Sequence, residues 1–323
     1  MRIKQLLTAL LVTGLLSACG SSGKPGTATP GARADTTATP SGNASAKEVA
    51  AAARGDVKCP AHSVAAPAGA PVDDVLGVRP GMTYQQAANA VMCSNPLLVI
   101  TPENGRGFQI QTYGQTIRQG FSARFAAARV QKTGRDYARE MEQEAMERGL
   151  NVARHDMKPG QSKWFVSTMG IPGQEKVIGA AREDWFAESR NPTMDSVEQA
   201  LINKYGTPTQ KTDQDSYHQL RWAYDPRGRL ITDTSPLYNK CRGVADPDGG
   251  MGLSADCGVI VEAAIQSLRS NPALAQLLQA GVVDQAGGYQ ALTDTKQVLQ
   301  TMDAARRAKQ VQDASKNAQA PQL

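Results

Sequence analysis

The sequence predicts an α+β fold of two tandem domains, each a helix packed on an antiparallel sheet, followed by a long C-terminal helix. The first observation behind this prediction is a turn, then Thr83, a residue type that caps helices, then apolar residues at helical spacing over 84–92. The second is a similar opening, in which a turn at Pro192 precedes a helical pattern over 194–205. Short alternating segments follow each helix, as in a meander of antiparallel strands. The two openings form a faint internal repeat, which favours the tandem arrangement.

The first domain is assigned to residues 57–160. Its helix over 84–92 ends at Cys93, and Gly149 is expected to end a charge-rich, exposed helix over 135–148. Turn-forming residues between these helices separate three expected strands, at 97–100, 108–113 and 121–130.

The second domain is assigned to residues 161–316. It opens with an apolar strand over 164–169, which turns at a Gly-Ile-Pro-Gly sequence and returns over 175–181. Gly206 is expected to stop the helix over 194–205. The remaining strands are expected at 220–224, 229–231, 257–262 and 277–284, and a helix over 291–316 precedes a disordered tail at 317–323.

The N-terminus predicts export and lipid attachment. Arg2 and Lys4 precede an apolar run over 6–16, which is shorter than the roughly 20 residues that a membrane-spanning helix needs. A small residue then stands directly before Cys19. Residues 1–18 therefore resemble a lipoprotein signal peptide, whose removal leaves Cys19 to carry lipid.

Residues 19–56 are rich in Gly, Ser, Thr, Ala and Pro, a composition that is too poor in large apolar side chains to form a core. They are expected to form a disordered tether, with a short helix over 46–53, that holds the domains away from the lipid surface. Gly20 follows the lipidated cysteine, where an Asp would retain the protein at the inner membrane. The expected location is therefore periplasm-facing and lipid-anchored, at the outer membrane.

The charge balance argues against a nucleic-acid partner. The chain has 35 basic and 30 acidic side chains, a net charge of +5, and loss of Arg2 and Lys4 with the signal peptide reduces it to +3. Nucleic-acid-binding proteins instead show a clustered basic face. Only 5% of residues are aromatic, which leaves few platforms for stacked bases. The sequence also predicts no cofactor.

Four cysteines remain beside Cys19, and an even number in an oxidising compartment predicts two disulfides. Three pairings are possible, of which the nearest-neighbour one, Cys59–Cys93 and Cys241–Cys257, is favoured. A four-cysteine zinc site is the alternative, but such sites use close pairs such as Cys-x-x-Cys, which this chain lacks.

The sequence carries no recognisable catalytic motif, and the chain is not predicted to be an enzyme. His62, His155 and His218 lie near no cysteine, serine or acidic pair at a catalytic spacing, so each is expected to have a surface or structural role. Residues 246–250 alternate acidic residues as calcium loops do, but the third ligand and the closing Glu are missing. A turn inside the disulfide loop is expected there. An enzyme with a site assembled from distant residues stays as an alternative.

A candidate protein-binding surface comprises Arg182, Trp185, Phe186 and Arg190. Guanidinium and aromatic side chains together are typical of protein interfaces. Three carboxylates lie in the same stretch, so acid–base chemistry is an alternative, but a solvated edge with an aromatic anchor is favoured.

Several patches resemble known envelope proteins. Residues 170–177, 200–208 and 220–228 resemble a group of envelope proteins of Gram-negative bacteria, and 77–92 resembles the Gly-x-x-x-Gly-Met-Thr/Ser opening of outer-membrane assembly lipoproteins of the BamE type. The order of lipid signal, tether and two α+β domains resembles the two-domain periplasmic lipoproteins that act as immunity proteins against type IV secretion effectors. The domains of those proteins are similar in fold to FrpD-like lipoproteins.

The resemblance implies a binding protein without catalytic activity. The expected function is that of an envelope lipoprotein that binds a secreted antibacterial effector and neutralises it by occluding its active site. The alternative is a structural or assembly lipoprotein of the outer membrane. The expected partner is a protein, a secreted toxin in the first case, and the membrane is contacted through the Cys19 lipid.

Overall fold

The structure is a computed structural model that describes residues 42–59, 70–103, 106–149 and 157–318. Its elements in chain order are α1 (Ala46–Arg54), α2 (Tyr84–Ser94), β1 (Leu98–Pro102), β2 (Gly120–Phe125), α3 (Gly134–Gly149), β3 (Ser162–Met169), β4 (Lys176–Trp185), α4 (Met194–Tyr205), β5 (Gln210–Gln214), β6 (Tyr217–Ala223), β7 (Val259–Leu268), β8 (Asn271–Asp284) and α5 (Gln285–Asn317).

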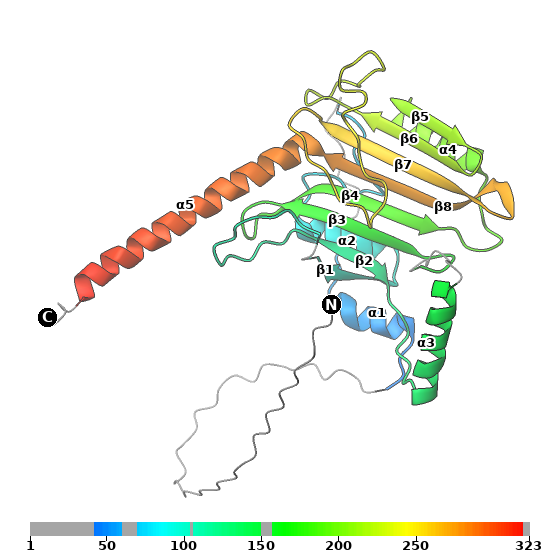
Figure 1. The fold of residues 1–323 in the computed structure, drawn as a ribbon, viewed down its shortest axis with the longest axis horizontal. Coiled ribbons are helices and arrows are strands. Elements are labelled where there is room, and N and C mark those ends of the chain that lie inside the picture. The colour runs from blue at the N-terminus through cyan, green and yellow to red at the C-terminus, as the bar shows by residue number, and fades with distance from the viewer. Residues whose placement is uncertain (1–41, 60–69, 104–105, 150–156, 319–323) are drawn as a thin grey trace, which may run out of the picture. The chain divides into compact units, whose positions relative to one another are not determined.

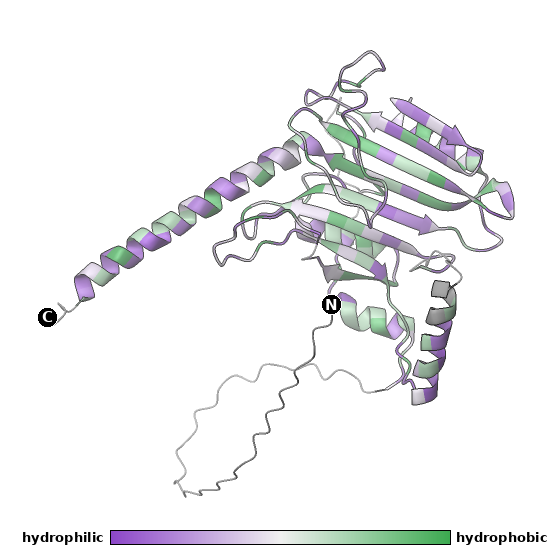
Figure 2. Cartoon of the chain, viewed as in Figure 1, coloured by the Kyte–Doolittle hydropathy of each residue, from purple (hydrophilic) through white to green (hydrophobic). Residues whose placement is uncertain are grey.

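The eight strands form one antiparallel sheet in the order β1-β2-β3-β4-β8-β7-β6-β5 (Figure 1). α2 contacts β1 to β4, α4 contacts β7 and β8, and α5 contacts β3, β4, β7 and β8. The predicted α+β class, the antiparallel sheet and the C-terminal helix are confirmed. Figure 2 shows that β7, inside the sheet, is largely apolar, whereas the edge strand β5 is largely polar.

The sheet consists of two halves with the same order of elements. The first half is α2 followed by β1 to β4, and the second is α4 followed by β5 to β8. Thr83 and Thr193 are the N-caps of the two helices, and the side chain of each accepts a hydrogen bond from the backbone of the third helical residue. The sequence predicted the cap at Thr83. Both threonines also form an isolated bridge to the last strand of their own half, Thr83 to Lys176 and Thr193 to Leu274.

The two halves repeat each other in detail. The β3–β4 pairing shifts register between Ser167 and Thr168, and the β7–β8 pairing shifts at the corresponding place, between Gln266 and Ser267. Such a bulge bends the strand, so both halves bend at the same point. The halves join where β4 pairs with β8, and Arg182 lies opposite Ala280 in that pairing. Ala280 is also the repeat equivalent of Arg182, because Lys176 and Leu274 are equivalent through the two threonine bridges. An approximate two-fold axis therefore passes between Arg182 and Ala280.

The main core lies between the sheet and the helices α2 and α4. Its largest fully buried side chains include Trp164, Trp222 and Phe121. The indole Nε1 of Trp222 donates to the backbone oxygen of Gly206, the residue that ends α4, at 2.7 Å, which ties the end of the helix to β6. This bond satisfies a buried polar group that would otherwise destabilise the core.

A second, smaller cluster includes Ile260, Val283 and the disulfide Cys241–Cys257. It uses residues of β7 and β8 that alternate with those of the main core, so it lies on the opposite face of the sheet. The chain between the two cysteines lies against this face. Asp248 pairs there with Lys163 and, at 3.3 Å, with Arg124. The expected turn at 246–250 is confirmed, and it binds basic side chains through Asp248.

Both predicted disulfides are present. Cys59 and Cys93 have Cα atoms 5.6 Å apart and Cys241 and Cys257 have Cα atoms 5.5 Å apart, within the range that disulfides require. The first joins the end of α2 to the chain after α1, and the second closes the loop on the opposite face of the sheet. Each links residues within one half of the fold.

The structure differs from the expected elements at four places. Residues 229–231 form no strand, and Leu230 makes an isolated bridge to Tyr224 instead. Residues 108–113 form no strand, because β1 pairs directly with β2 and this stretch is the connection between them. β5, a short polar strand at the sheet edge, was not predicted from the sequence. The short helix expected over 46–53 forms as α1, but residues 42–56 are not wholly a disordered tether: α1 contacts β1, and its Arg54 donates to the backbone oxygen of Met92 at 2.9 Å.

α5 continues directly from β8 and is capped by Asp284. Its first turns are anchored, since Gln285, Gly288 and Leu299 are buried, whereas residues 304–318 are all exposed. No helix in the described part of the chain combines the length and the hydropathy needed to cross a membrane.

Gly281 provides a test of the loop on the second face. A Cβ atom at this position would lie 1.9 Å from the backbone oxygen of Val244, so Gly281→Ala must push the loop off the sheet. We expect a loss of about 1–3 kcal/mol in the free energy of unfolding, the usual range for overpacking. Urea denaturation followed by circular dichroism measures it. Gly250→Ala, in the same loop but with open space around the new methyl group, is the control and should be nearly neutral. Equal stability of the two variants would contradict this packing.

Candidate functional site

The four residues of the predicted interface do not form one surface. Arg182 lies within β4, and Trp185, three residues further on, has the opposite parity and therefore points to the other side of the strand. Arg182 and Phe186 line one pocket, whereas Trp185 and Phe186 line a second hollow, which is more polar. Arg190 is exposed beyond the strand. The structure thus brings Arg182 and Phe186 together at one site.

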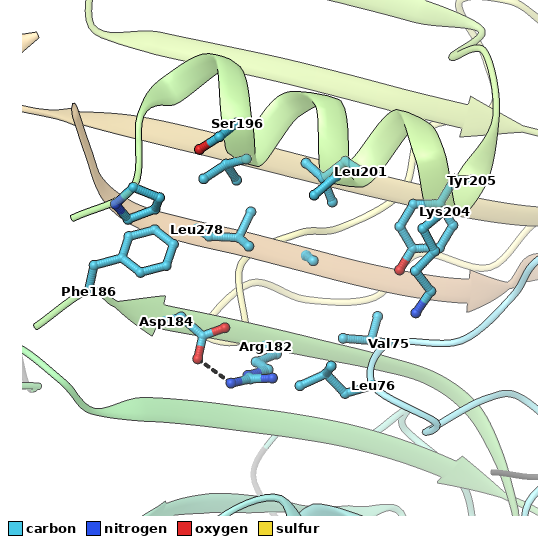
Figure 3. A pocket seen from close by; sticks show the side chains of 14 residues that line it. Val75, Leu76, Arg182, Asp184, Phe186, Ser196, Leu201, Lys204, Tyr205 and Leu278 are labelled. Atoms are coloured by element: carbon cyan, nitrogen blue, oxygen red, sulfur yellow. Dashed lines mark hydrogen bonds and ion pairs between the residues drawn. The ribbon is translucent and has the colours of Figure 1, made fainter. Parts of the chain in front are cut away.

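The pocket that they share has a volume of about 420 Å³ and lies at the junction of the two halves. α4, with Leu201, forms one side, and Arg182 of β4 lies on the other (Figure 3). Ala200 of α4 and Ala280 of β8, which is paired with Arg182, also line the pocket. Leu76, from the segment before α2, lines it as well. The volume is within the roughly 300–1,000 Å³ that is usual for ligand sites. Since the approximate two-fold axis passes between Arg182 and Ala280, the pocket lies on that axis.

One ion pair dominates the polar part of the pocket. Nη2 of Arg182 donates to Oδ1 of Asp184 at 2.5 Å, and the guanidinium lies 5.2 Å from the ring centre of Trp164. Asp184 is 23% exposed, and its removal from water raises the pKa of the carboxyl, an effect that the charge and hydrogen bond of Arg182 partly oppose. The buried Nε of Arg182 has no hydrogen-bond partner among the described residues.

A second set of contacts holds the end of α4 against the segment before α2. Nζ of Lys204 lies 2.8 Å from Oδ2 of Asp74, and the Tyr205 hydroxyl donates to the backbone oxygen of Asp74 at 2.8 Å. Burial, followed by the nearby charge of Asp74, strongly raises the pKa of Tyr205, so its hydroxyl stays protonated and keeps donating. These contacts fix the position of one wall of the pocket.

The rim of the pocket carries a strained backbone at Leu76. Val75 and Val78 exchange two backbone hydrogen bonds, at 2.9 and 3.0 Å, around a two-residue turn. The turn requires positive φ at both central residues, and Leu76 has φ 45° and Gly77 φ 82°. A leucine in this left-handed region costs of order 1 kcal/mol or more. Its side chain is nevertheless 55% exposed, so the strain holds an apolar side chain in solvent.

A group of charged side chains connects α4 to the edge strand β5 and its neighbour β6. Nδ1 of His218 is 3.0 Å from Oε2 of Glu198 and 3.9 Å from Oδ1 of Asp213. Nζ of Lys211 lies 2.5 Å from Oε1 of Glu198 and 3.0 Å from Oδ2 of Asp213. Hydrogen bonds to Glu198 and then Asp213 raise the pKa of Lys211. Glu198, Asp213 and His218 carry the kinds of oxygen and nitrogen atoms that can bind a metal ion. The other predicted site residues, Cys19, His62 and His155, lie outside the described residues.

The chain matches no family model, no curated protein sequence and no solved structure.

The pocket was missed at the sequence level because its residues come from segments far apart in the chain. Val75, Leu76 and Val78 appear as a short extended segment, and the turn at their centre lacks the Asn-Gly signal that usually marks it. The helical pattern of α4 identified its buried face but not the strand pair beneath it. The residue types of Arg182 and Phe186 predicted an interface, and Asp184 is one of the three carboxylates of the same stretch.

The raised pKa of Asp184 predicts a pH-dependent contribution to stability. The folded protein holds this proton more tightly than the unfolded chain, so stability falls as pH rises from about 4, where an unfolded Asp ionises, through the raised pKa of Asp184. Asp184→Asn replaces the carboxyl with an amide, which does not titrate. We therefore expect the free energy of unfolding of the wild type, relative to Asp184→Asn, to decrease as the pH rises above about 4 and through the raised pKa of Asp184.

The measurement is urea denaturation at several pH values. Asp225→Asn is a control of opposite sign, because backbone and side-chain hydrogen bonds from Arg229 lower the pKa of Asp225. The wild type should lose stability relative to that variant as the pH falls through the lowered pKa. If the stability difference from wild type changed with pH in the same direction for both variants, burial would not raise the pKa of Asp184.

Proposed function

We propose that this protein is a lipid-anchored envelope protein that binds a secreted antibacterial effector and neutralises it, and that the effector docks at the junction pocket. The observation that carries the proposal is Leu76, an apolar side chain kept in solvent by a strained turn at the mouth of an apolar pocket. Strain of this kind is typical of binding sites, where the surrounding structure maintains it.

The charges around the pocket favour a protein ligand over a small charged one. Arg182 is paired with Asp184 and Lys204 with Asp74, so each basic group has an acidic partner. A protruding apolar side chain of a partner can fill the space between α4 and the sheet, with the ion pairs at its edge. Apolar anchors in a pocket with a polar surround are how most protein interfaces concentrate their affinity.

The rest of the chain is consistent with this role. Two disulfides suit an oxidising compartment such as the periplasm. Lipid on Cys19 and the residues that follow it would hold the protein at the outer membrane, where an incoming effector arrives. We further propose that the two halves are the tandem units expected from the sequence, with the boundary between Trp185 and Met194 instead of at residue 160. Their fusion along β4 and β8 creates the pocket.

A contact-killing assay tests the function. Cells that lack the gene should be killed by sister cells that secrete effectors through a type IV system, and the wild-type gene should restore survival. Full survival of the deletion strain would contradict the proposal. If the deletion instead lowers the levels of outer-membrane barrel proteins, the assembly function is favoured.

Leu76→Asn separates binding from folding. Asn adopts the left-handed conformation more readily than Leu, so the variant should fold at least as well. Loss of one buried leucine at an interface should weaken effector binding by about 10- to 100-fold. The measurements are thermal unfolding, and protection of the deletion strain by the variant gene.

Val130→Asn is the matched control for this variant. Val130 is 61% exposed and follows β2, which belongs to the first half of the sheet, whereas α4 contacts β7 and β8 of the second half. It should protect as the wild type does. Full protection by Leu76→Asn, or equal loss with Val130→Asn, would show that the pocket is not the docking site.

A further inference from the structure

We propose that Glu198, Asp213 and His218 form a binding site for a divalent transition-metal ion of the zinc type, which joins α4 to the edge strand β5 and its neighbour β6. The three side chains come from three different elements and converge on one point. Imidazole with carboxylates suits zinc and its neighbours, whereas calcium and magnesium prefer oxygen ligands alone.

The distances fit one ion. Ligand bonds of about 2.1 Å in a tetrahedral site place the donor atoms about 3.4 Å from each other. Nδ1 of His218 is 3.0 Å from Oε2 of Glu198 and 3.9 Å from Oδ1 of Asp213, on either side of that value. Glu198 and His218 are largely shielded, with side chains 13% and 19% exposed, so two of the three ligands are already held in place.

Lys211 leaves these donor atoms accessible. Its ammonium contacts Oε1 of Glu198 and Oδ2 of Asp213, the oxygens that do not face His218. Each carboxylate therefore presents one oxygen to the lysine and the other to the imidazole. Lys211 is 38% exposed on the edge strand and can swing into solvent. Its positive charge opposes an incoming cation, so it should lower the affinity without blocking the site.

Comparison of the two halves shows that packing does not require this cluster. When α2 and α4 are aligned on their threonine N-caps, Glu198 of α4 corresponds to Ala88 of α2, which is 3% exposed. Through the strand pairings, His218 corresponds to Phe121, which is fully buried and packs edge-on against Tyr84 at 5.1 Å. The first half thus closes its helix on its sheet with apolar contacts at the same positions.

The second half places an acid and an imidazole there, and Lys211 stands where the first half has Ile100. Burying polar groups in place of apolar ones costs stability unless they are paired. Lys211 already pairs with both carboxylates, and His218 with Glu198. A bound cation would use the remaining carboxylate oxygens and the imidazole nitrogen together. The outer side of α4 would then be tied to the sheet, while its inner side lines the junction pocket.

The test is titration of the full chain, purified in mild detergent, with zinc chloride by isothermal calorimetry. We expect one zinc ion per chain at this site. Glu198→Gln and His218→Gln should each weaken binding by at least about tenfold, since loss even of a residue that only supports a ligand costs that much. Thermal unfolding without zinc shows whether each variant is folded.

Lys211→Met makes the test independent of folding defects. Removing the competing charge should strengthen zinc binding by about two- to fivefold, the effect of one exposed ion-pair interaction. Lys240→Met, which breaks the exposed pair with Asp256 on the other face, is the matched control and should leave the affinity unchanged.

The proposal is overturned if zinc does not bind, if Glu198→Gln and His218→Gln bind it as the wild type does, or if Lys211→Met weakens binding. Displacement of zinc by an equal concentration of magnesium or calcium would also overturn it, because the site would then bind any divalent cation through charge alone. None of these outcomes depends on effector binding.

Discussion

The pairing of β4 with β8 is the contact on which the rest of the structure depends. It joins two units of similar design into one sheet, and it runs over seven residue pairs from Gly179–Val283 to Trp185–Leu277. Without it, each half would expose a long apolar edge strand, which is prone to pair with other chains. The outer edges are protected differently. α1 contacts β1, and β5 carries charged side chains.

The junction also explains why the candidate site is asymmetric although the fold repeats. The axis passes between Arg182 and Ala280, one a large cation and the other a methyl group. Arg182, its ion-pair partner Asp184 and Ala280 all line the pocket, but the only helix among its lining residues is α4 of the second half. The site is therefore asymmetric although it lies on the axis, because it combines a charged residue of β4 with a small one of β8.

Local features of the fold were predictable from the sequence, and long-range ones were not. Thr83 and Thr193 cap their helices through contacts three residues away, and the cysteines pair with their nearest neighbours, so composition and spacing were sufficient. The β4–β8 pairing links residues about 100 positions apart, and the sequence of neither strand indicates which strand it pairs with. β5 has no apolar alternation because it lies at the edge, and so it was missed.

The candidate sites follow the same division. Arg182 and Phe186 attracted attention by residue type, which indicates an interface but not its shape. The pocket needs α4, the strand junction and the turn at Leu76, and the cluster at His218 needs three elements. Neither has a linear signature, because side chains from separate segments are brought together only by the tertiary fold.

The position of Arg182 on the axis bears on how the chain avoids assembling with its neighbours. If β4 of one molecule paired with β4 of another in the native register, Arg182 would lie opposite Arg182, and two guanidinium groups would meet in the seam. Like charges directly opposite each other destabilise a strand pair. Within one molecule Arg182 meets Ala280 and this repulsion is absent. One residue therefore makes closure within the chain more favourable than exchange between chains.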